Sequence, residues 1–225
     1  MRYFPVNLDL QGRKVLVVGG GPVGEGKARG LVEAGAAVTL VSPVVTTPLQ
    51  EMEARGELAV RLREFAPEDL EGFFLIIGAT NDPAVNKQVY DLASARNLLC
   101  NIVDHRALCN FLTPSLFNRG PIQISVSTGG VSPTIGQLIR EKISDVVGPE
   151  FETLLEISAE LRARAQATIP GFNERKELLS EFAHSDALQF IIEGKEDLAR
   201  ALADSLLKKH LAISDQNSAN ESGSN

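Results

Sequence analysis

The sequence predicts an α/β fold, in which a parallel sheet formed by the first half of the chain is followed by a helical C-terminal part. Short β-branched apolar runs alternate with helical patterns as far as Asp104, as in parallel βαβ units. A glycine-rich turn joins the first run to the first helical pattern. After Gly148 the chain is rich in Leu, Ala, Glu and Arg, which favours helices.

Five apolar runs are too short for helices, and we interpret them as buried strands. Between them, apolar residues at helical spacing predict three helices, the last of which begins at Pro83 behind the N-cap residue Asp82. The short connections imply right-handed crossovers within one sheet. The expected strands cover residues 14–18, 37–42, 58–62, 73–79 and 98–103, and the expected helices cover residues 23–34, 47–55 and 83–96.

Beyond Asp104 the pattern changes. Residues 111–113 and 122–127 are expected to be strands, and the second buries only one face because its apolar and polar residues alternate. Ser132-Pro133 opens a further helix. From Pro149 to His210 we expect three or four helices with breaks near residues 170, 184 and 194, and we expect residues 211–225 to be disordered.

Length and composition limit the class of protein. With 225 residues, 44% of them apolar and 23% charged, the chain is long enough for one large or two small globular domains. No apolar run approaches the roughly 18–20 residues that span a bilayer, and the N-terminus lacks the apolar stretch of a signal peptide. We therefore expect a cytoplasmic protein that does not bind membranes.

The net charge of −7 argues against nucleic acid as a partner, because such binding needs clustered cations. The charge is unevenly distributed: residues 1–144 contain 14 acidic and 14 basic side chains, whereas residues 145–225 contain 15 acidic and 8 basic ones. The half with the glycine-rich turn is therefore neutral, and its charge does not disfavour a small polyanionic ligand.

Residues 19–24 read Gly-Gly-Gly-Pro-Val-Gly, a G-x-G-x-x-G motif directly after a strand and at the start of a helix. In this Rossmann-type context, Gly19 permits the tight turn, Gly21 lets a pyrophosphate approach the backbone, and Gly24 lets helix and strand pack closely. The helix N-terminus then attracts the phosphates. The alternative interpretation is a connecting turn without a ligand.

The motif leaves the choice between NAD and NADP open. The acidic residue that binds the ribose 2′-OH about 20 residues later is missing, because the second strand ends at Val41-Ser42-Pro43. No nearby arginine clearly selects a 2′-phosphate. Ser42 could bind the ribose or could be an ordinary surface serine. Thr80, at the end of the fourth strand, could contact the ribose or the nicotinamide.

Asp104 ends the fifth strand at the same sheet edge and is the first candidate for a catalytic acid or base, since a strand end can hold a carboxylate partly desolvated. His105 and Cys109 are close in sequence, but consecutive residues of extended chain point in opposite directions. Cys100 and Cys109 also fit neither a disulfide framework nor a four-thiolate site. We therefore expect no protein-bound metal.

Residues 127–133 form a second glycine-containing turn, which could bind an anion or could simply connect a strand to a helix.

The run VLVVGGGPVGEGKARGLVEAGAAVTLVSP, followed by GATNDPAVN, CNIVD, FLTPS and ISVSTGGVSPTIGQLIREKI, resembles the dehydrogenase and ferrochelatase module of siroheme synthesis, the precorrin-2 dehydrogenase family. The resemblance implies an enzyme that oxidises precorrin-2, a tetrapyrrole, to sirohydrochlorin with NAD; bifunctional members also take Fe²⁺ as a substrate. It further implies a homodimer with a dinucleotide domain at residues 1–113, a central dimerisation segment at 114–147 and a C-terminal helical domain at 148–210.

Carried over residue by residue, the resemblance makes Asp104 the catalytic aspartate. Thr128 replaces the serine of the synthases and retains a hydroxyl. The substrate carries eight carboxylates, and the expected tetrapyrrole contacts are Ser127, Thr128 and Gly129 with Arg119 and Arg140, although each arginine taken alone is better interpreted as an exposed surface cation. Arg106 and Lys142 are further cations around the expected cleft. The expected NAD contacts are Gly19, Gly21, Pro22, Val23, Gly24, Ser42, Pro43, Val44, Thr80 and Asn101.

Two other functions stay open at this point. A regulatory module that senses NAD(H) would need the glycine motif and the helices, but it gives no reason for Asp104 at the sheet edge. An ordinary small-metabolite dehydrogenase would be expected to show a Tyr-x-x-x-Lys or His/Arg catalytic set, and none is visible.

Overall fold

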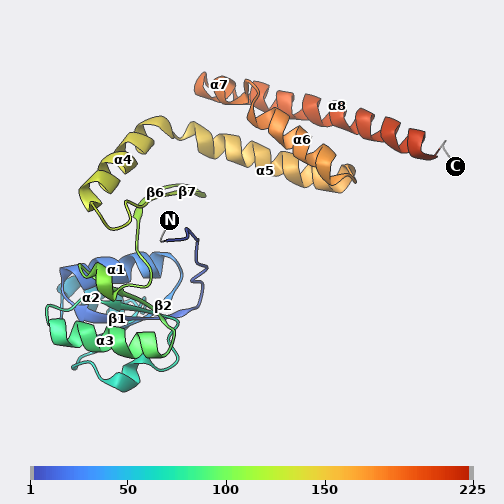
Figure 1. Ribbon diagram of the computed structural model, residues 1–225. Helices are drawn as coiled ribbons and strands as arrows, with labels where there is room; N and C mark the ends of the chain where they lie inside the picture. Colours follow the sequence, from blue (N-terminus) through green and yellow to red (C-terminus); the bar gives the residue numbers. More distant parts are fainter. Residues whose placement is uncertain (1–2, 223–225) are drawn as a thin grey trace. The chain divides into compact units, whose positions relative to one another are not determined.

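The computed structural model describes the backbone of residues 3–222 and the side chains of residues 3–214. Within it, the chain forms two compact units (Figure 1). The first consists of the chain up to Thr113 together with residues 127–132, and the second consists of residues 114–126 and the chain from Pro133 onward. Among the described residues, no helix combines the length and the apolar character that a membrane span requires.

The first unit contains a five-stranded parallel sheet in the order β3-β2-β1-β4-β5. The chain builds outward from β1 to β3 and then returns to place β4 on the other side of β1. Open α/β sheets bind ligands where the strand order reverses in this way, at the carboxyl ends of the strands. The elements are β1 (Lys14–Gly20), α1 (Pro22–Glu33), β2 (Ala37–Val45), α2 (Thr47–Ala54), β3 (Ala59–Arg61), η1 (Pro67–Leu70), β4 (Leu75–Gly78), α3 (Pro83–Ala95), β5 (Leu99–Ile102) and η2 (Arg106–Leu108).

Both faces of this sheet are buried. On β1, Val15 and Val17 pack into one core with residues of α1 and α2, whereas Leu16 and Val18 pack into a second core with residues of α3. Figure 1 shows α1 and α3 on opposite faces of the sheet. Burial on both sides explains why these strands are unbroken apolar runs and do not alternate with polar residues.

The predicted Rossmann-type fold is confirmed, with five parallel strands at the expected positions. The prediction of a strand at residues 111–113 is wrong. The carbonyl oxygen of Phe111 accepts a hydrogen bond of 3.0 Å from the side-chain amide of Asn101, and the backbone pairs with β5 only through a bridge between Asn101 and Cys109. The side chain of Asn101 thus takes the place of a backbone hydrogen bond between strands at Phe111. The next strand begins at Ser115.

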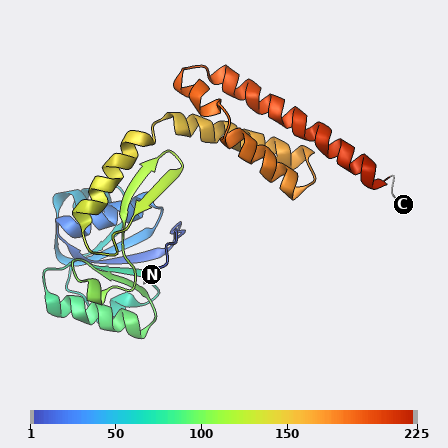
Figure 2. The ribbon, with the colours of Figure 1, turned by 45° about the horizontal axis from the view of Figure 1, so that its top comes forward.

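The second unit begins with an antiparallel hairpin, against which α4 packs. Figure 2 shows the hairpin beside α4. In the described chain four further helices share a separate apolar core, in which Leu161, Leu178 and Phe182 are at most 1% exposed. The helix breaks lie where the sequence predicts them. The elements are β6 (Ser115–Arg119), β7 (Ile122–Val126), α4 (Pro133–Val146), α5 (Glu150–Thr168), α6 (Phe172–Ala183), α7 (Ala187–Ile192) and α8 (Glu196–Ser222).

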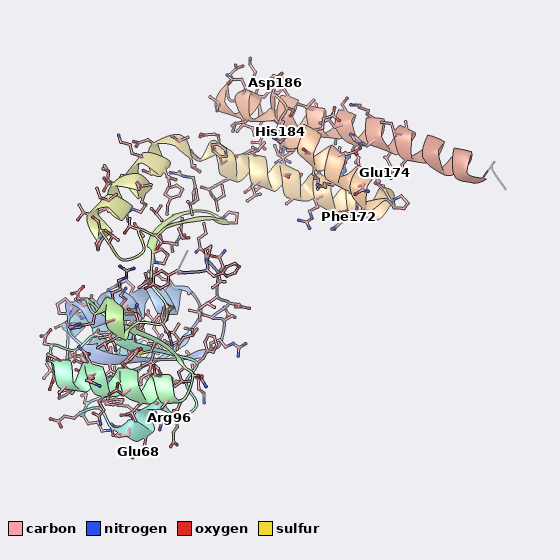
Figure 3. The ribbon with its side chains drawn as sticks, in the orientation of Figure 1. Glu68, Arg96, Phe172, Glu174, His184 and Asp186 are labelled. Carbon is pink, nitrogen blue, oxygen red and sulfur yellow. The ribbon has the colours of Figure 1, made fainter. Side chains whose placement is uncertain are left out.

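Helix α8 contradicts the expectation of disorder from residue 211, because it continues to Ser222. Residues of α6 hold it: Glu181 contacts His210 at 2.8 Å, and Glu174, labelled in Figure 3, accepts a hydrogen bond of 3.1 Å from Ser214. Residues 223–225 lie outside the described part of the chain. The predicted three-domain division, with boundaries at 113 and 147, stays a prediction.

Candidate active site

The glycine-rich turn after β1 leaves no room for side chains at three of its positions, Gly19, Gly20 and Gly24. Gly19 has a φ of 115°, and a Cβ atom there would collide with the carbonyl group of Ala79. A Cβ atom at Gly24 would collide with the carbonyl oxygen of Gly19, so α1 packs this closely on the turn only with glycine. By contrast, no atom lies within 4 Å of the place a Cβ of Gly21 would take. The backbone at Gly21 is therefore open to a ligand.

Helix α1 begins at Pro22, directly behind Gly21, and no side chain caps it. Its first N–H groups and the positive end of its dipole are therefore available to an anion. Pro22 and Val23 lie exposed in this first turn. The turn and the helix together can bind phosphate through backbone groups alone.

The carboxyl end of β2 runs past the same turn. β2 extends beyond its predicted end at Ser42 to Val45, which pairs with Gly20 after a bulge. Ser42 is only 8% exposed, and its hydroxyl donates a hydrogen bond of 2.7 Å to the carbonyl of Val44. It is therefore not an ordinary surface serine, and its oxygen can serve a ribose only as an acceptor. Pro43 and Val44 are exposed.

Thr80 lies in a hydrogen-bonded turn after β4. Its hydroxyl donates to the side-chain oxygen of Asn86 at 3.1 Å, and the Asn86 amide donates to the carbonyl of Thr80 at 2.9 Å. Asn86 is 4% exposed and is not among the site residues predicted from sequence. The sequence could have revealed Asn86, because it shares the buried stripe of α3 with Val89 and Ala93. A buried side-chain amide needs a hydrogen-bond partner.

Asp104 lies in the turn that follows β5, which is closed by a hydrogen bond from the His105 N–H to the carbonyl of Ile102. Its φ of 60° is left-handed, a conformation that Asp and Asn tolerate better than most residues. The partial desolvation expected for Asp104 is wrong, because its side chain is exposed. β5 ends at Ile102, and the turn carries the carboxylate into solvent.

Lys27 on α1 is a charged residue of this region that sequence reasoning missed. Its ammonium group donates a hydrogen bond of 3.0 Å to the hydroxyl of Thr113. Burial lowers the pKa of Lys27, and the negative charge of Asp104 opposes this effect. The sequence could have indicated this residue, because a lysine three residues after Gly24 must lie on the first turns of the helix that follows the glycine motif. The structure thus places a cation close enough to act on Asp104.

The residues around Asp104 do not form a metal centre: the described part of the chain contains no cluster of three or more His, Cys, Asp or Glu side chains suited to a metal ion. The Cys109 thiol donates to the carbonyl oxygens of Ile102 and His105, each at 3.2 Å. Burial raises the pKa of Cys109, and it raises that of Cys100 to about 12. Both cysteines are neutral thiols.

The second glycine-containing turn belongs to the same unit as the candidate aspartate. The Thr128 hydroxyl accepts the N–H of Ser132 and donates to its carbonyl, each at 3.1 Å, and the Ser127 hydroxyl accepts the N–H of Gly129 at 3.2 Å. Gly129 and Gly130 have φ values of 64° and 77°. The hydroxyl of Thr128 therefore serves to close the turn.

The two arginines predicted to bind substrate belong to the second unit. Arg119 on β6 lies over the ring of Phe117, 5.5 Å from its centroid. Arg140 on α4 has Glu141 beside it at 4.0 Å. The first unit therefore brings together the predicted cofactor residues, Asp104 and the second turn, but it does not contain these two arginines.

Comparisons with known proteins agree with this arrangement. Family models match three successive segments: "Putative NAD(P)-binding" at residues 6–115, "Sirohaem biosynthesis protein central" at 119–145 and "Sirohaem synthase dimerisation region" at 151–207. A solved structure described as "SirC, precorrin-2 dehydrogenase" is similar over 90% of this chain and 100% of its own, with a TM-score of 0.77 and 30% sequence identity. The chain belongs to the precorrin-2 dehydrogenase family.

Curated relatives extend the comparison for this precorrin-2 dehydrogenase family member and confirm the resemblance found in its motifs. The siroheme synthase of Photorhabdus laumondii is 35% identical over 218 residues, and that of Neisseria meningitidis serogroup C is 36% identical over 207 residues. These matches cover 95% and 90% of this chain, but 46% and 43% of the relatives. The chain thus spans about half the length of the curated relatives it matches.

Proposed function

We propose that this member of the precorrin-2 dehydrogenase family oxidises precorrin-2 to sirohydrochlorin with NAD. The observation that carries the proposal is that Asp104 follows β5 at the carboxyl edge of a sheet whose first turn is open to a dinucleotide at Gly21. The similarity to SirC over the whole length of that chain supports the choice of substrate.

The backbone of the first turn fits a dinucleotide, because Gly21 borders open space and α1 has no side-chain cap. Residues 42–45, which end β2, are uncharged, and this favours NAD over the 2′-phosphorylated cofactor. Gly19 and Gly24 shape the turn. The proposed contacts to NAD are Gly21, Pro22, Val23, Ser42, Pro43, Val44, Thr80 and Asn101.

Oxidation of precorrin-2 removes a hydride and a proton. Bound NAD supplies the hydride acceptor. We assign the proton to Asp104, whose exposed carboxylate can reach a substrate laid against the sheet edge and accept the proton directly. Lys27 adds a positive charge near this carboxylate.

The proposed substrate contacts lie in both units. Ser127, Thr128 and Gly129 offer backbone N–H groups and hydroxyls at the second turn, within the unit that contains Asp104. Arg119 and Arg140, from the second unit, are proposed to bind carboxylates of the tetrapyrrole, which a guanidinium can hold through two parallel hydrogen bonds.

The test uses the purified full chain with precorrin-2 and NAD. The expected result is a rise in NADH absorbance together with the spectrum of sirohydrochlorin. The variant Asp104→Asn serves as the control, because asparagine tolerates the left-handed backbone at this position but cannot accept the proton. Absence of both signals with the wild-type chain would contradict the dehydrogenase assignment. NAD binding without tetrapyrrole binding would favour the regulatory sensor instead.

A second activity, insertion of Fe²⁺ into sirohydrochlorin, is proposed because the curated relatives are named siroheme synthases. Insertion expels two pyrrole protons, which the Asp104 carboxylate can accept one after the other if it passes the first to water before it takes the second; Fe²⁺ is then a substrate. Sirohydrochlorin and Fe²⁺ are mixed with and without the protein, and NAD is omitted. Faster formation of the siroheme spectrum with the protein supports this activity, whereas equal rates remove it.

We propose a cytoplasmic homodimer as the assembled form. The match of residues 151–207 to a dimerisation-region model supports the dimer. Light scattering is expected to give twice the chain mass of 24.2 kDa. A monomeric mass at micromolar concentration would contradict it.

A further inference from the structure

An arginine without a carboxylate partner lies two residues beyond Asp104. Arg106 begins η2, and its side chain is exposed. Among the described residues, no carboxylate lies within ion-pairing distance of it, and its contacts are with neutral groups. Most other arginines of the same unit are already paired: Arg29 with Glu25, Arg55 with Glu57, and Arg61 and Arg63 with Asp69.

Neutral contacts hold Arg106 on two sides. Its guanidinium carbon lies 5.9 Å from the centroid of the Tyr3 ring, within the range of a cation–π interaction. Its Cδ and Nε atoms lie 3.1 and 3.4 Å from the place that a Cβ atom of Gly130 would take. Gly130 also has a φ of 77°, a left-handed backbone conformation that favours glycine, so the arginine stem packs against a position without a side chain.

This combination of restraint and unbalanced charge suits an anion supplied by a ligand. A guanidinium presents five N–H donors in a fixed fork that matches the two oxygens of a carboxylate. Holding the side chain against Tyr3 and Gly130 reduces the rotamer freedom that is lost when an anion binds. Arg106 is therefore prepared to bind a carboxylate next to the candidate base and against the turn proposed to contact the substrate.

We propose that Arg106 binds an acid side chain of the tetrapyrrole and thereby fixes the orientation of the macrocycle relative to Asp104. The inference rests on the proposed function and extends it by assigning a carboxylate-binding residue within the first unit. It also gives Gly130 a role at the site, since a Cβ atom there would lie 3.1 Å from Cδ of Arg106 and press on the arginine stem.

Two variants of Arg106 separate its charge from its packing. Arg106→Met keeps the aliphatic stem against Gly130 and removes the charge. Arg106→Lys keeps the charge but loses the planar guanidinium, which can form two parallel hydrogen bonds with a carboxylate. The matched control is Arg96→Met, because Arg96 is an exposed arginine of the same unit at the C-terminal end of α3, labelled in Figure 3. Dissociation constants are measured for sirohydrochlorin from its absorbance change and, separately, for NAD.

Arg106→Met is expected to raise the dissociation constant for sirohydrochlorin about tenfold. This is the lower end of the range for losing a charge-assisted hydrogen bond, because the site is open to water. Arg106→Lys is expected to restore part of the loss, and NAD binding and the Arg96→Met variant are expected to match the wild type. If Arg106→Met binds sirohydrochlorin as tightly as the wild type, the inference is wrong but the proposed function is not affected. The same holds if Arg106→Met weakens only the binding of NAD. A wild-type chain that binds no tetrapyrrole would remove the proposed function and this inference together.

Discussion

The ammonium group of Lys27 on α1 donates a hydrogen bond of 3.0 Å to the hydroxyl of Thr113, which is 86 residues later in the chain. The contact ties the helix that opens the dinucleotide site to the segment that leaves the sheet after Asp104. Because its partner is a neutral hydroxyl, the charge of Lys27 is left to act on the nearby carboxylate.

Replacing Lys27 is expected to alter the pH dependence of stability. Burial lowers the pKa of Lys27 below 10.5, so the folded chain releases this proton at a lower pH than the unfolded chain and gains stability as the pH rises toward 10.5. Lys27→Met should lack this gain. Urea denaturation at several pH values below 10.5 measures it, and Lys87→Met, which removes an exposed lysine paired with Asp91 on α3, is the control. The same pH dependence in Lys27→Met and wild type would contradict the buried ammonium group.

The variant Asp104→Asn is expected to reduce kcat for precorrin-2 oxidation at least 100-fold, the lower end of the range for loss of a general base. The dissociation constant for NAD should stay unchanged, since the side chain lies beyond β5 and is exposed. Steady-state kinetics and a separate NAD titration measure the two effects. Wild-type turnover in this variant would exclude Asp104 from the mechanism.

Two glycines of the first turn are expected to respond differently to alanine. A Cβ atom at Gly21 meets no atom within 4 Å, so Gly21→Ala should fold normally and bind NAD at least tenfold more weakly, because the methyl group obstructs the pyrophosphate. A Cβ atom at Gly24 collides with the Gly19 carbonyl, so Gly24→Ala should lower the free energy of unfolding by about 1–3 kcal/mol. Thermal melts and NAD titrations distinguish them. Equal NAD affinity in Gly21→Ala and wild type would argue against the phosphate site.

The stability of the first unit should depend on Asp69 in a defined pH range. Asp69 is 2% exposed, and hydrogen bonds, first from Arg63, lower its pKa from 3.8 to about 2. A depressed pKa in the folded state stabilises the fold above pH 4 or so, and this stabilisation is lost as the pH falls toward 2.

Asp69→Asn is therefore expected to lower the free energy of unfolding by about 1–2 kcal/mol at neutral pH, a value limited by the exposure of the arginines. The difference from wild type should shrink toward pH 2. Urea denaturation at several pH values measures it, with the exposed Asp91→Asn as the control. A constant difference at all pH values would disprove the ionic origin.

Removal of a core ring from the helical unit should leave the dinucleotide site intact. Phe182 is 1% exposed, so Phe182→Ala is expected to cost about 3–5 kcal/mol in that unit. Phe172→Ala is the control, since Phe172 lies on the same helix α6 at 72% exposure (Figure 3). Calorimetry should show an earlier transition in Phe182→Ala only, while NAD affinity is unchanged in both variants. Loss of NAD binding in Phe182→Ala would show that the two units are energetically coupled.

Local pattern was sufficient for most elements and for the first turn. The strand of β1 and the motif Gly19 to Gly24 could be predicted because burial on both faces and a tight turn each impose their own residue types. The errors have local causes as well. Residues 111–113 contain an apolar strand-like run, but the Asn101 amide takes the Phe111 carbonyl that a ladder would need.

The order of strands and helices, the glycine-rich turn and the family follow from the sequence, because each depends on residues close together in the chain. Only the tertiary structure showed that Asp104 is exposed, that Asn86 holds the turn of Thr80, that Lys27 reaches Thr113 and that Arg106 packs on Gly130. Such contacts depend on where the chain leaves each strand and on which segments then meet. No periodicity in the sequence encodes a hydrogen bond between residues 86 positions apart.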